Sequence, residues 1–205
     1  MIGAMGNHVL RVACRQALKW QAGRAPVRVA VNISAVQFTR PGFVNSIVDI
    51  LRETGLRPEL LELELTESAL IRDRDDGIRK MQRLKNLDVH ISIDDFGTGY
   101  FSLSYLQNMP LDALKIDRSF TMKLGPSQTT LSMVRAIIAM ARALGLRIVT
   151  EGVENSVQVE IPRKLGCDEA QGYFFGKSES ADDSVSRVLL SNVPLVILSP
   201  ALVSL

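Results

Sequence analysis

Short apolar segments with strand character alternate with amphipathic helical segments along most of this 205-residue chain. Regular alternation of this kind favours parallel strands joined by right-handed crossovers, in a barrel or an open doubly wound sheet. The predicted strands are residues 28–33, 60–66, 90–94, 114–117, 147–151 and 170–175, and the predicted helices lie near residues 7–20, 43–54, 78–87 and 129–144. The sequence therefore predicts one α/β architecture.

Charge and aromatic content argue against two kinds of nucleic-acid binding. Lys and Arg number 24 against 22 Asp and Glu, a net charge of +2, which is small for a protein that neutralises a phosphate backbone. Aromatic residues make up 5% of the chain, which is few for a platform that stacks single-stranded bases. We therefore expect no nucleic-acid polymer as a partner.

Cysteine usage and the two ends of the chain suggest a location. Cys14 and Cys167 are far apart and lack metal-ligand spacing, so we expect reduced thiols and a cytoplasmic protein. The segment before the first predicted helix, residues 1–6, is short and has no charged side chain, so we expect no secretory leader there. The apolar segment 188–205 contains Pro194 and Pro200 and has no flanking cluster of positive charge, so we expect no membrane span.

Polar residues lie at or near the ends of the predicted strands. In a (β/α) barrel the carboxyl ends of the strands converge on one mouth, where active sites lie. Several carboxylates there would repel one another unless cations neutralised them, and oxygen ligands suit Mg²⁺ or Mn²⁺. Two adjacent aspartates suit two neighbouring ions, an arrangement used for phosphoryl displacement. The residues are Asn32, Glu64, Glu67, Asp94, Asp95, Lys115, Asp117, Glu151, Glu154 and Gln171.

A structural interpretation competes for single members of this set. One carboxylate at a strand end is most often a helix N-cap or an ion-pair partner, and Glu67 and Asp117 fit that description. Six such strand ends in succession are harder to explain as caps, so the set as a whole favours a metal site.

The densest local motif is DDFGTGYFSL at residues 94–103. Gly97 and Gly99 permit backbone conformations that other residues avoid, and Thr98 adds a hydroxyl group. The loop either moves over a ligand and shapes the aspartate pair, or is a plain strand-to-helix turn.

These motifs together resemble the EAL domain family of bacterial second-messenger signalling. The segments that carry the resemblance are VNISAVQF, LELTES, DDFGTGY, LKIDRSF, EGVE and CDEAQGYFFGK, in order between residues 7 and 177. The resemblance implies a TIM-barrel-like fold and a hydrolase, a phosphodiesterase that converts cyclic-di-GMP to the linear dinucleotide pGpG with two Mg²⁺ or Mn²⁺ ions.

The resemblance also implies roles for individual residues. The metal ligands would be Asn32, Glu64, Asp94, Asp95 and Glu151, and the catalytic residues Lys115, Asp95 and Glu151. Lys115 matches the lysine that orients the attacking water or assists its deprotonation, and Glu67 matches the anchor of the glycine-rich loop. Residues placed near the substrate or in that loop are Glu67, Gly97, Thr98, Gly99, Glu154 and Gln171.

One part of the family pattern does not occur in these 205 residues. The pattern begins with two further strands, the second ending in Glu-Ala-Leu, and the glutamate of that motif is a metal ligand. We therefore expect a partial EAL domain at residues 1–180, an incomplete barrel with open edges at strands 28–33 and 170–175, and a separate tail at residues 181–205. Either the strand-like segment 193–198 covers an open edge, or two chains pair their edges in a homodimer.

Three functions remain open at this point. The chain is a cyclic-di-GMP phosphodiesterase, or a catalytically inactive EAL-like module that binds cyclic-di-GMP or a protein partner, or a fragment without a function of its own. Retention of the other ligands favours the first, and absence of the Glu-Ala-Leu strand favours the second.

Overall fold

The computed structural model describes residues 2–21, 27–71, 73–99, 103–125, 127–177 and 195–198. The chain divides into two compact units, Met1–Ile91 with Ser178–Leu205 and Ser92–Lys177. The strand pairs within each unit are parallel, as the alternating sequence pattern predicts. Among the helices of the described segments, none combines the length and apolar character that a membrane crossing needs.

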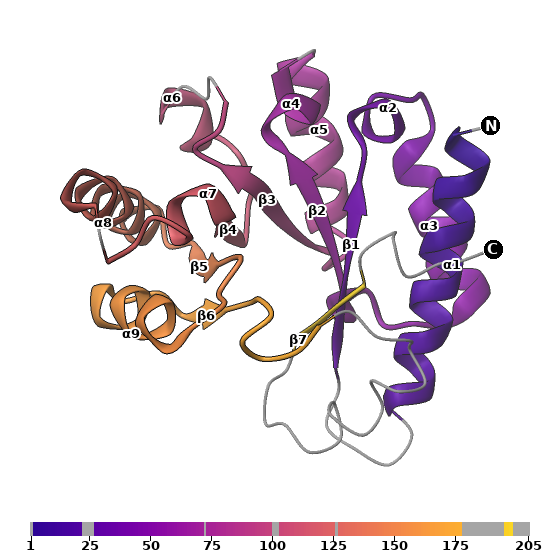
Figure 1. Cartoon of the computed structure of the whole chain (residues 1–205). Helices are drawn as coiled ribbons and strands as arrows, with labels where there is room; N and C mark the ends of the chain where they lie inside the picture. The colour runs from indigo at the N-terminus through magenta and orange to yellow at the C-terminus, as the bar shows by residue number, and fades with distance from the viewer. Residues whose placement is uncertain are drawn as a thin grey trace. The chain divides into compact units, whose positions relative to one another are not determined.

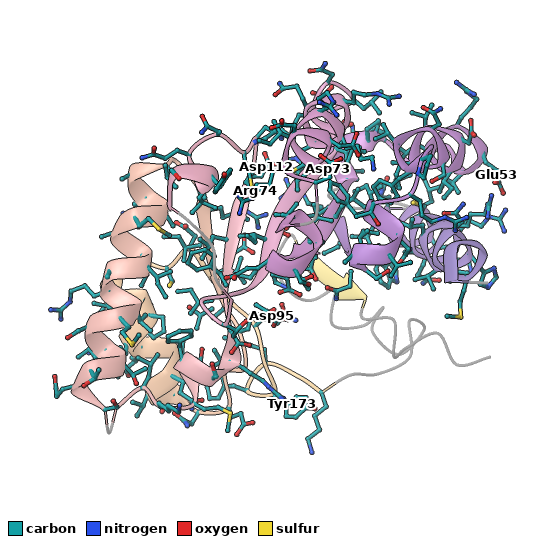
Figure 2. The ribbon with its side chains drawn as sticks, turned by 90° about the horizontal axis from the view of Figure 1, so that it is seen from above. Glu53, Asp73, Arg74, Asp95, Asp112 and Tyr173 are labelled. Carbon is teal, nitrogen blue, oxygen red and sulfur yellow. The ribbon has the colours of Figure 1, made fainter. Side chains whose placement is uncertain are left out.

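In the first unit, β1 lies between β2 and β7, and α1 packs on β1 and α3 (Figure 1). Arg11 and Arg15 of α1 donate to the carboxylate of Glu53 on α3, labelled in Figure 2, across distances of 2.7 Å. The elements are α1 (Ile2–Gln21), β1 (Arg28–Ile33), α2 (Ala35–Phe38), α3 (Phe43–Thr54), η1 (Pro58–Leu60), β2 (Leu61–Thr66), α4 (Glu67–Ile71), α5 (Arg74–Lys85) and β7 (Leu195–Leu198).

The core of the first unit follows from the sequence pattern. Strands β1 and β2 are buried along nearly their whole length, as parallel strands covered by helices are. On α3 the apolar side chains recur at helical spacing and are buried, and the helix ends at Gly55, whose φ of 77° is the left-handed conformation typical of a glycine cap. The predicted bounds of α3 are confirmed.

The first helix starts earlier than predicted. The sequence indicates a helix from about residue 7, after Gly3 and Gly6, because apolar residues recur at helical spacing from there on. In the structure α1 begins at Ile2, and the two glycines let the side chains of Arg40 and Gln37 lie directly on the helix surface. Tertiary packing therefore extends the helix by more than one turn.

Within the C-terminal segment, β7 pairs in parallel with β1, from Arg28 opposite Leu195 to Val31 opposite Leu198. The rest of the segment 178–205 lies outside the described residues, as do residues 100–102 of the glycine-rich loop. A separate tail from residue 181 that covers a sheet edge remains a proposal. The pairing of β7 with β1 indicates which strand edge it would cover.

In the second unit the strand order is β3-β4-β5-β6, and α8 packs on β4, β5 and α9 (Figure 1). The first two residues of β3 still belong to the first unit. The elements are β3 (His90–Phe96), α6 (Leu103–Leu106), β4 (Ala113–Ile116), α7 (Arg118–Thr121), α8 (Gln128–Ala143), β5 (Arg147–Thr150), α9 (Ser156–Leu165) and β6 (Glu169–Ala170).

The strand predicted at residues 170–175 is wrong beyond Ala170. The chain turns there, and the backbone N–H of Phe175 donates to the carbonyl of Gly172. Gly172 lies so close to the backbone of Val153 that a Cβ atom would overlap it. The apolar run therefore forms a turn against the β5–α9 connection, and Tyr173, labelled in Figure 2, is 62% exposed.

Candidate metal centre

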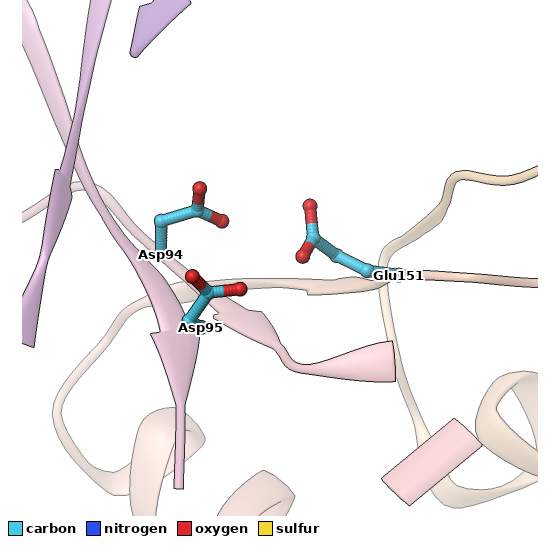
Figure 3. A group of neighbouring side chains, drawn as sticks. All are labelled: Asp94, Asp95 and Glu151. Carbon is cyan, nitrogen blue, oxygen red and sulfur yellow. The ribbon is translucent and has the colours of Figure 1, made fainter. Parts of the chain in front are cut away.

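Three carboxylates gather at the ends of β3 and β5 (Figure 3). Asp94, Asp95 and Glu151 each offer an oxygen, and these oxygens all lie within 4.8 Å of one another. Asp94 is buried, Glu151 is half-buried and Asp95 is exposed, so the cluster is open to solvent on one side. All three belong to the second unit.

A β-bulge explains how two consecutive residues reach the same cluster. Side chains of neighbouring strand residues normally point to opposite faces. Between β3 and β4 the register advances from Ile93–Leu114 to Phe96–Ile116, so β3 contains one extra residue. Asp95 has φ of 55°, the left-handed conformation that Asp tolerates better than most residues. The bulge therefore turns the Asp95 carboxylate toward that of Asp94.

A buried lysine bridges two of the carboxylates. Lys115 on β4 is 2% exposed, and its Nζ lies 3.0 Å from Asp94 Oδ1 and 2.7 Å from Glu151 Oε1. The register of β4 against β5 explains the second contact, because Lys115 lies opposite Val149 and Glu151 follows two residues later on the same face. The ammonium group supplies one positive charge to the three carboxylates.

The pKa values of the carboxyl groups respond to this crowding. Burial raises the pKa of Glu151 to about 7, the charge of Lys115 acts to lower it, and the charge of Asp94 raises it. Burial and the charges of Asp94 and Asp117 raise the pKa of Asp95. In the metal-free protein the cluster therefore favours a proton on part of its carboxylates near neutral pH.

Asp117 is a further acid beside the cluster. It is the N-cap of α7, where its Oδ1 accepts from the backbone N–H of Ser119 at 2.9 Å. Burial acts to raise its pKa, but hydrogen bonds from Ser119 and from the side chain of Asp95 outweigh that effect and hold the pKa below the ordinary value. The sequence indicates either a member of the polar set at the strand ends or a helix N-cap for Asp117, and the structure shows the cap. Its position two residues after Lys115 in the predicted strand is the signal that places both on one face.

The donor set fits a hard divalent cation. Carboxylate oxygens are the ligands that Mg²⁺ and Mn²⁺ prefer, and no His or Cys belongs to the cluster. In the metal-free protein the ammonium group of Lys115 supplies part of the positive charge that such an ion would contribute. Metal binding and proton loss from the cluster are therefore expected to be linked.

The first unit holds three other predicted site residues. Asn32 near the end of β1 lies directly opposite Glu64 on β2, so the two side chains share a face of that sheet. Glu64 is 1% exposed and Glu67, the first residue of α4, is 5% exposed. Their roles as metal ligands and loop anchor remain predictions.

The glycine-rich loop closes on Asp95. The backbone N–H and the hydroxyl of Thr98 both donate to the carbonyl of Asp95, the hydroxyl at 2.9 Å. Gly97 has φ of 99°, as the motif predicts, whereas Gly99 is exposed and is not among the described glycines with positive φ. The turn therefore fixes the backbone of one candidate ligand.

The remaining predicted residues lie around the β5–α9 connection. Glu154 is exposed, and its backbone N–H donates to Gln158 Oε1 at 2.7 Å. Among the described residues, its side chain is not part of the carboxylate cluster. The backbone N–H of Gln171 donates to the carbonyl of Thr150 at 2.8 Å, next to Glu151 in the chain. Its Oε1 is buried and has no hydrogen-bond partner among the described groups. Their roles near a substrate remain predictions.

Comparison with known proteins identifies the relatives of this arrangement. The EAL domain family model matches residues 1–178. The cyclic di-GMP phosphodiesterase NbdA of Pseudomonas aeruginosa is 46% identical over 178 residues, which cover 86% of this chain and 23% of NbdA. The chain spans between 21% and 29% of the length of the curated relatives that it matches.

Solved structures share the fold. The Pseudomonas aeruginosa MucR phosphodiesterase, in complex with c-di-GMP, is 43% identical with a TM-score of 0.85, over 89% of this chain and 74% of that chain. BlrP1 of Klebsiella pneumoniae, solved with manganese and c-di-GMP, is 26% identical with a TM-score of 0.76, over 85% of this chain and 44% of that chain. A calcium complex of BlrP1 is also known. These likenesses confirm the predicted α/β, TIM-barrel-like fold.

Proposed function

The chain belongs to the EAL domain family, and we propose that it hydrolyses cyclic-di-GMP to linear pGpG with two divalent metal ions, Mg²⁺ or Mn²⁺. The observation that carries the proposal is the cluster of Asp94, Asp95 and Glu151, whose oxygens lie within 4.8 Å of one another at the ends of β3 and β5. The phosphodiesterase activity for which NbdA is named, and the c-di-GMP and manganese of the related structures, support the same substrate and metals.

The proposed metal ligands of the second unit are the three clustered carboxylates. Bound divalent cations would supply positive charge that lowers the pKa of water and neutralises the phosphodiester. Asp94 and Glu151 are held in place by Lys115, and Asp95 by the bulge of β3 and the turn at Thr98. Asn32 and Glu64, which lie opposite one another in the first unit, are proposed as further ligands by family resemblance.

Lys115 is proposed to orient the attacking water or to assist its deprotonation. Its ammonium group is buried and held by two carboxylates, so its position is well defined. A fixed cation beside the reacting phosphate stabilises the charge that develops in the transition state more than a mobile cation does. Removing it should therefore lower kcat more than it raises KM.

Hydrolysis of cyclic-di-GMP by the purified chain tests the proposal. The assay measures pGpG by chromatography with Mg²⁺ and with Mn²⁺, for the parent and for Glu151→Ala. We expect product from the parent and a loss of more than about 100-fold in the variant, above the range for residues that only orient ligands. Glu160→Ala is the matched control, because Glu160 is an exposed glutamate on α9, outside the cluster.

The same protein distinguishes the alternative. If the folded parent makes no product but binds cyclic-di-GMP in a titration, the chain is an EAL-like binding module in signalling. Equal activity of the parent and Glu151→Ala would contradict the proposed metal centre.

Two finer features belong to the same proposal. We place the protein in the cytoplasm, because Cys14 and Cys167 are both free thiols and the proposed substrate is a second messenger. A homodimer that pairs open strand edges is the alternative to a covering tail, and light scattering of the purified chain tests it directly.

A further inference from the structure

The short helix α7 lies against both chain segments that carry the clustered carboxylates. It follows β4 directly, and the Asp117 cap at its start is hydrogen-bonded to the side chain of Asp95. Thr121 at its end is fully buried, and Leu124, in the turn that follows, is 3% exposed. The helical turn is therefore anchored in the core of the second unit.

One face of α7 meets the segment that follows the aspartate pair. Gly97 comes two residues after Asp95, with φ of 99°. A Cβ atom at this position would lie 2.7 Å from Cε2 and 2.8 Å from Cζ of Phe120, closer than real Cβ contacts come. The backbone of the loop therefore rests on the tip of the Phe120 ring, which would have to shift to admit a side chain at Gly97.

The start of α7 meets the segment that follows Glu151 in the same way. Gly152 is the next residue after Glu151 and has φ of 67°. A Cβ atom there would overlap Cβ of Arg118 and lie 3.1 Å from its Cα. The backbone N–H of Glu151 also donates to the carbonyl of Ile116, two residues before Arg118, at 3.1 Å.

We propose that α7 is a spacer that sets the separation of the Asp95 and Glu151 carboxylates, with Phe120 and Arg118 as positioning residues. The two glycines allow each ligand-bearing segment to approach the helix closely, so the width of α7 fixes the distance between the segments. This inference rests on the proposed function, because the separation matters only if the carboxylates hold metal together. Neither positioning residue needs to touch the metal or the substrate.

Manganese binding to the metal-free protein, followed by calorimetry and by the electron paramagnetic resonance of Mn²⁺, tests the spacer. Gly97→Ala and Gly152→Ala are each expected to weaken binding about 10- to 100-fold, the range for residues that orient ligands. Gly145→Ala is the matched control. Gly145 has φ of 71°, lies before the opposite end of β5, and would have no atom within 4 Å of an added Cβ. It therefore carries the backbone strain without the collision, and its Mn²⁺ affinity should equal that of the parent.

Second-site variants separate the collision from other effects. Phe120→Ala alone should weaken Mn²⁺ binding severalfold, because the loop loses the ring on which it rests. Adding Phe120→Ala to Gly97→Ala should restore affinity to the level of Phe120→Ala alone, and Arg118→Gly should likewise relieve Gly152→Ala. A purely structural role would change the melting temperature without this rescue of metal affinity.

Each outcome decides the matter. Affinities of the glycine variants that match Gly145→Ala, or double variants without rescue, overturn the spacer and leave the metal centre intact. If Gly97→Ala does not fold, the Phe120→Ala variant and the Gly152–Arg118 pair carry the test. A folded parent that binds no Mn²⁺ overturns the proposed metal centre itself, and the spacer with it.

Discussion

Strands β2 and β3 each carry two acidic residues, but their backbones present them differently. On β2, Glu62 and Glu64 are two residues apart in an unbroken ladder with β1, so regular alternation puts both on one face. On β3, Asp94 and Asp95 are consecutive, and a bulge with φ of 55° at Asp95 is needed to bring them together. A regular strand spaces ligands two residues apart, whereas closer spacing requires an irregular backbone with support from its neighbours.

The largest expected effect concerns Lys115, the buried lysine beside the bulged end of β3. Lys115→Met removes the charge between Asp94 and Glu151 but keeps most of the volume. Leaving buried carboxylates without their partner is expected to lower the free energy of unfolding of the metal-free protein by about 3–5 kcal/mol at pH 7. Denaturant unfolding measures the loss. Arg147→Met, which breaks the more exposed pair with Glu169, should cost only on the order of 1 kcal/mol.

The bulged end should also give the protein a characteristic pH dependence. The pKa of Glu151 is 4.5 in its ordinary state and about 7 in the folded metal-free protein, so the folded state holds the proton more tightly. The contribution of Glu151 to the free energy of unfolding is therefore greatest below pH 4.5 and is lost as the pH rises to about 7. For a pKa shift of this size the loss is about 3 kcal/mol. Glu151→Gln should remove this contribution to the slope in denaturant melts.

A matched variant completes the pH experiment. Glu160→Gln leaves Glu151 and its surroundings unchanged and should retain the slope. A Glu151→Gln profile parallel to that of the parent would show that burial does not hold the proton on this carboxyl group.

Because Asp95 lies in a bulge and Glu64 in a regular strand, substitution by glycine or valine should rank in opposite order of stability at the two positions. At Asp95 the left-handed conformation suits glycine and strains a β-branched residue, so Asp95→Gly should be more stable than Asp95→Val by about 1–2 kcal/mol. At Glu64 the regular strand should reverse the order, with Glu64→Val more stable than Glu64→Gly by about 1 kcal/mol. Thermal melts of the four metal-free variants give the two differences. The same order at both sites would contradict the bulge.

The smallest expected effect concerns the pairing of β7 with β1, on the side of β1 opposite β2. Deleting residues 188–205 removes β7 and exposes the edge of β1. We expect a loss of about 1 kcal/mol in stability and increased self-association, because an unpaired edge offers backbone groups to another chain. Sedimentation velocity and thermal melts check both effects. A truncated chain that stays monomeric and equally stable would exclude a covering role for the tail.

The sequence alone determined the class of the fold and the composition of the candidate site. Alternating strand and helix patterns predict the parallel strands, since buried strands appear as short apolar runs and half-buried helices as apolar residues at helical spacing. The aspartate pair, Lys115 and Glu151 are visible as polar residues at the ends of apolar strands. Asp94, Asp95 and Glu151 come together because the carboxyl ends of parallel strands in one sheet lie at the same edge.

Only the tertiary structure decided the backbone conformations that orient the side chains of the candidate site. The bulge at Asp95 depends on the pairing of β3 with β4, and the turn after Ala170 depends on the approach of Gly172 to Val153. The contacts of Gly97 and Gly152 with α7 join residues that are distant in the chain. Such features leave no periodic pattern, because steric exclusion between distant segments, not local propensity, sets them.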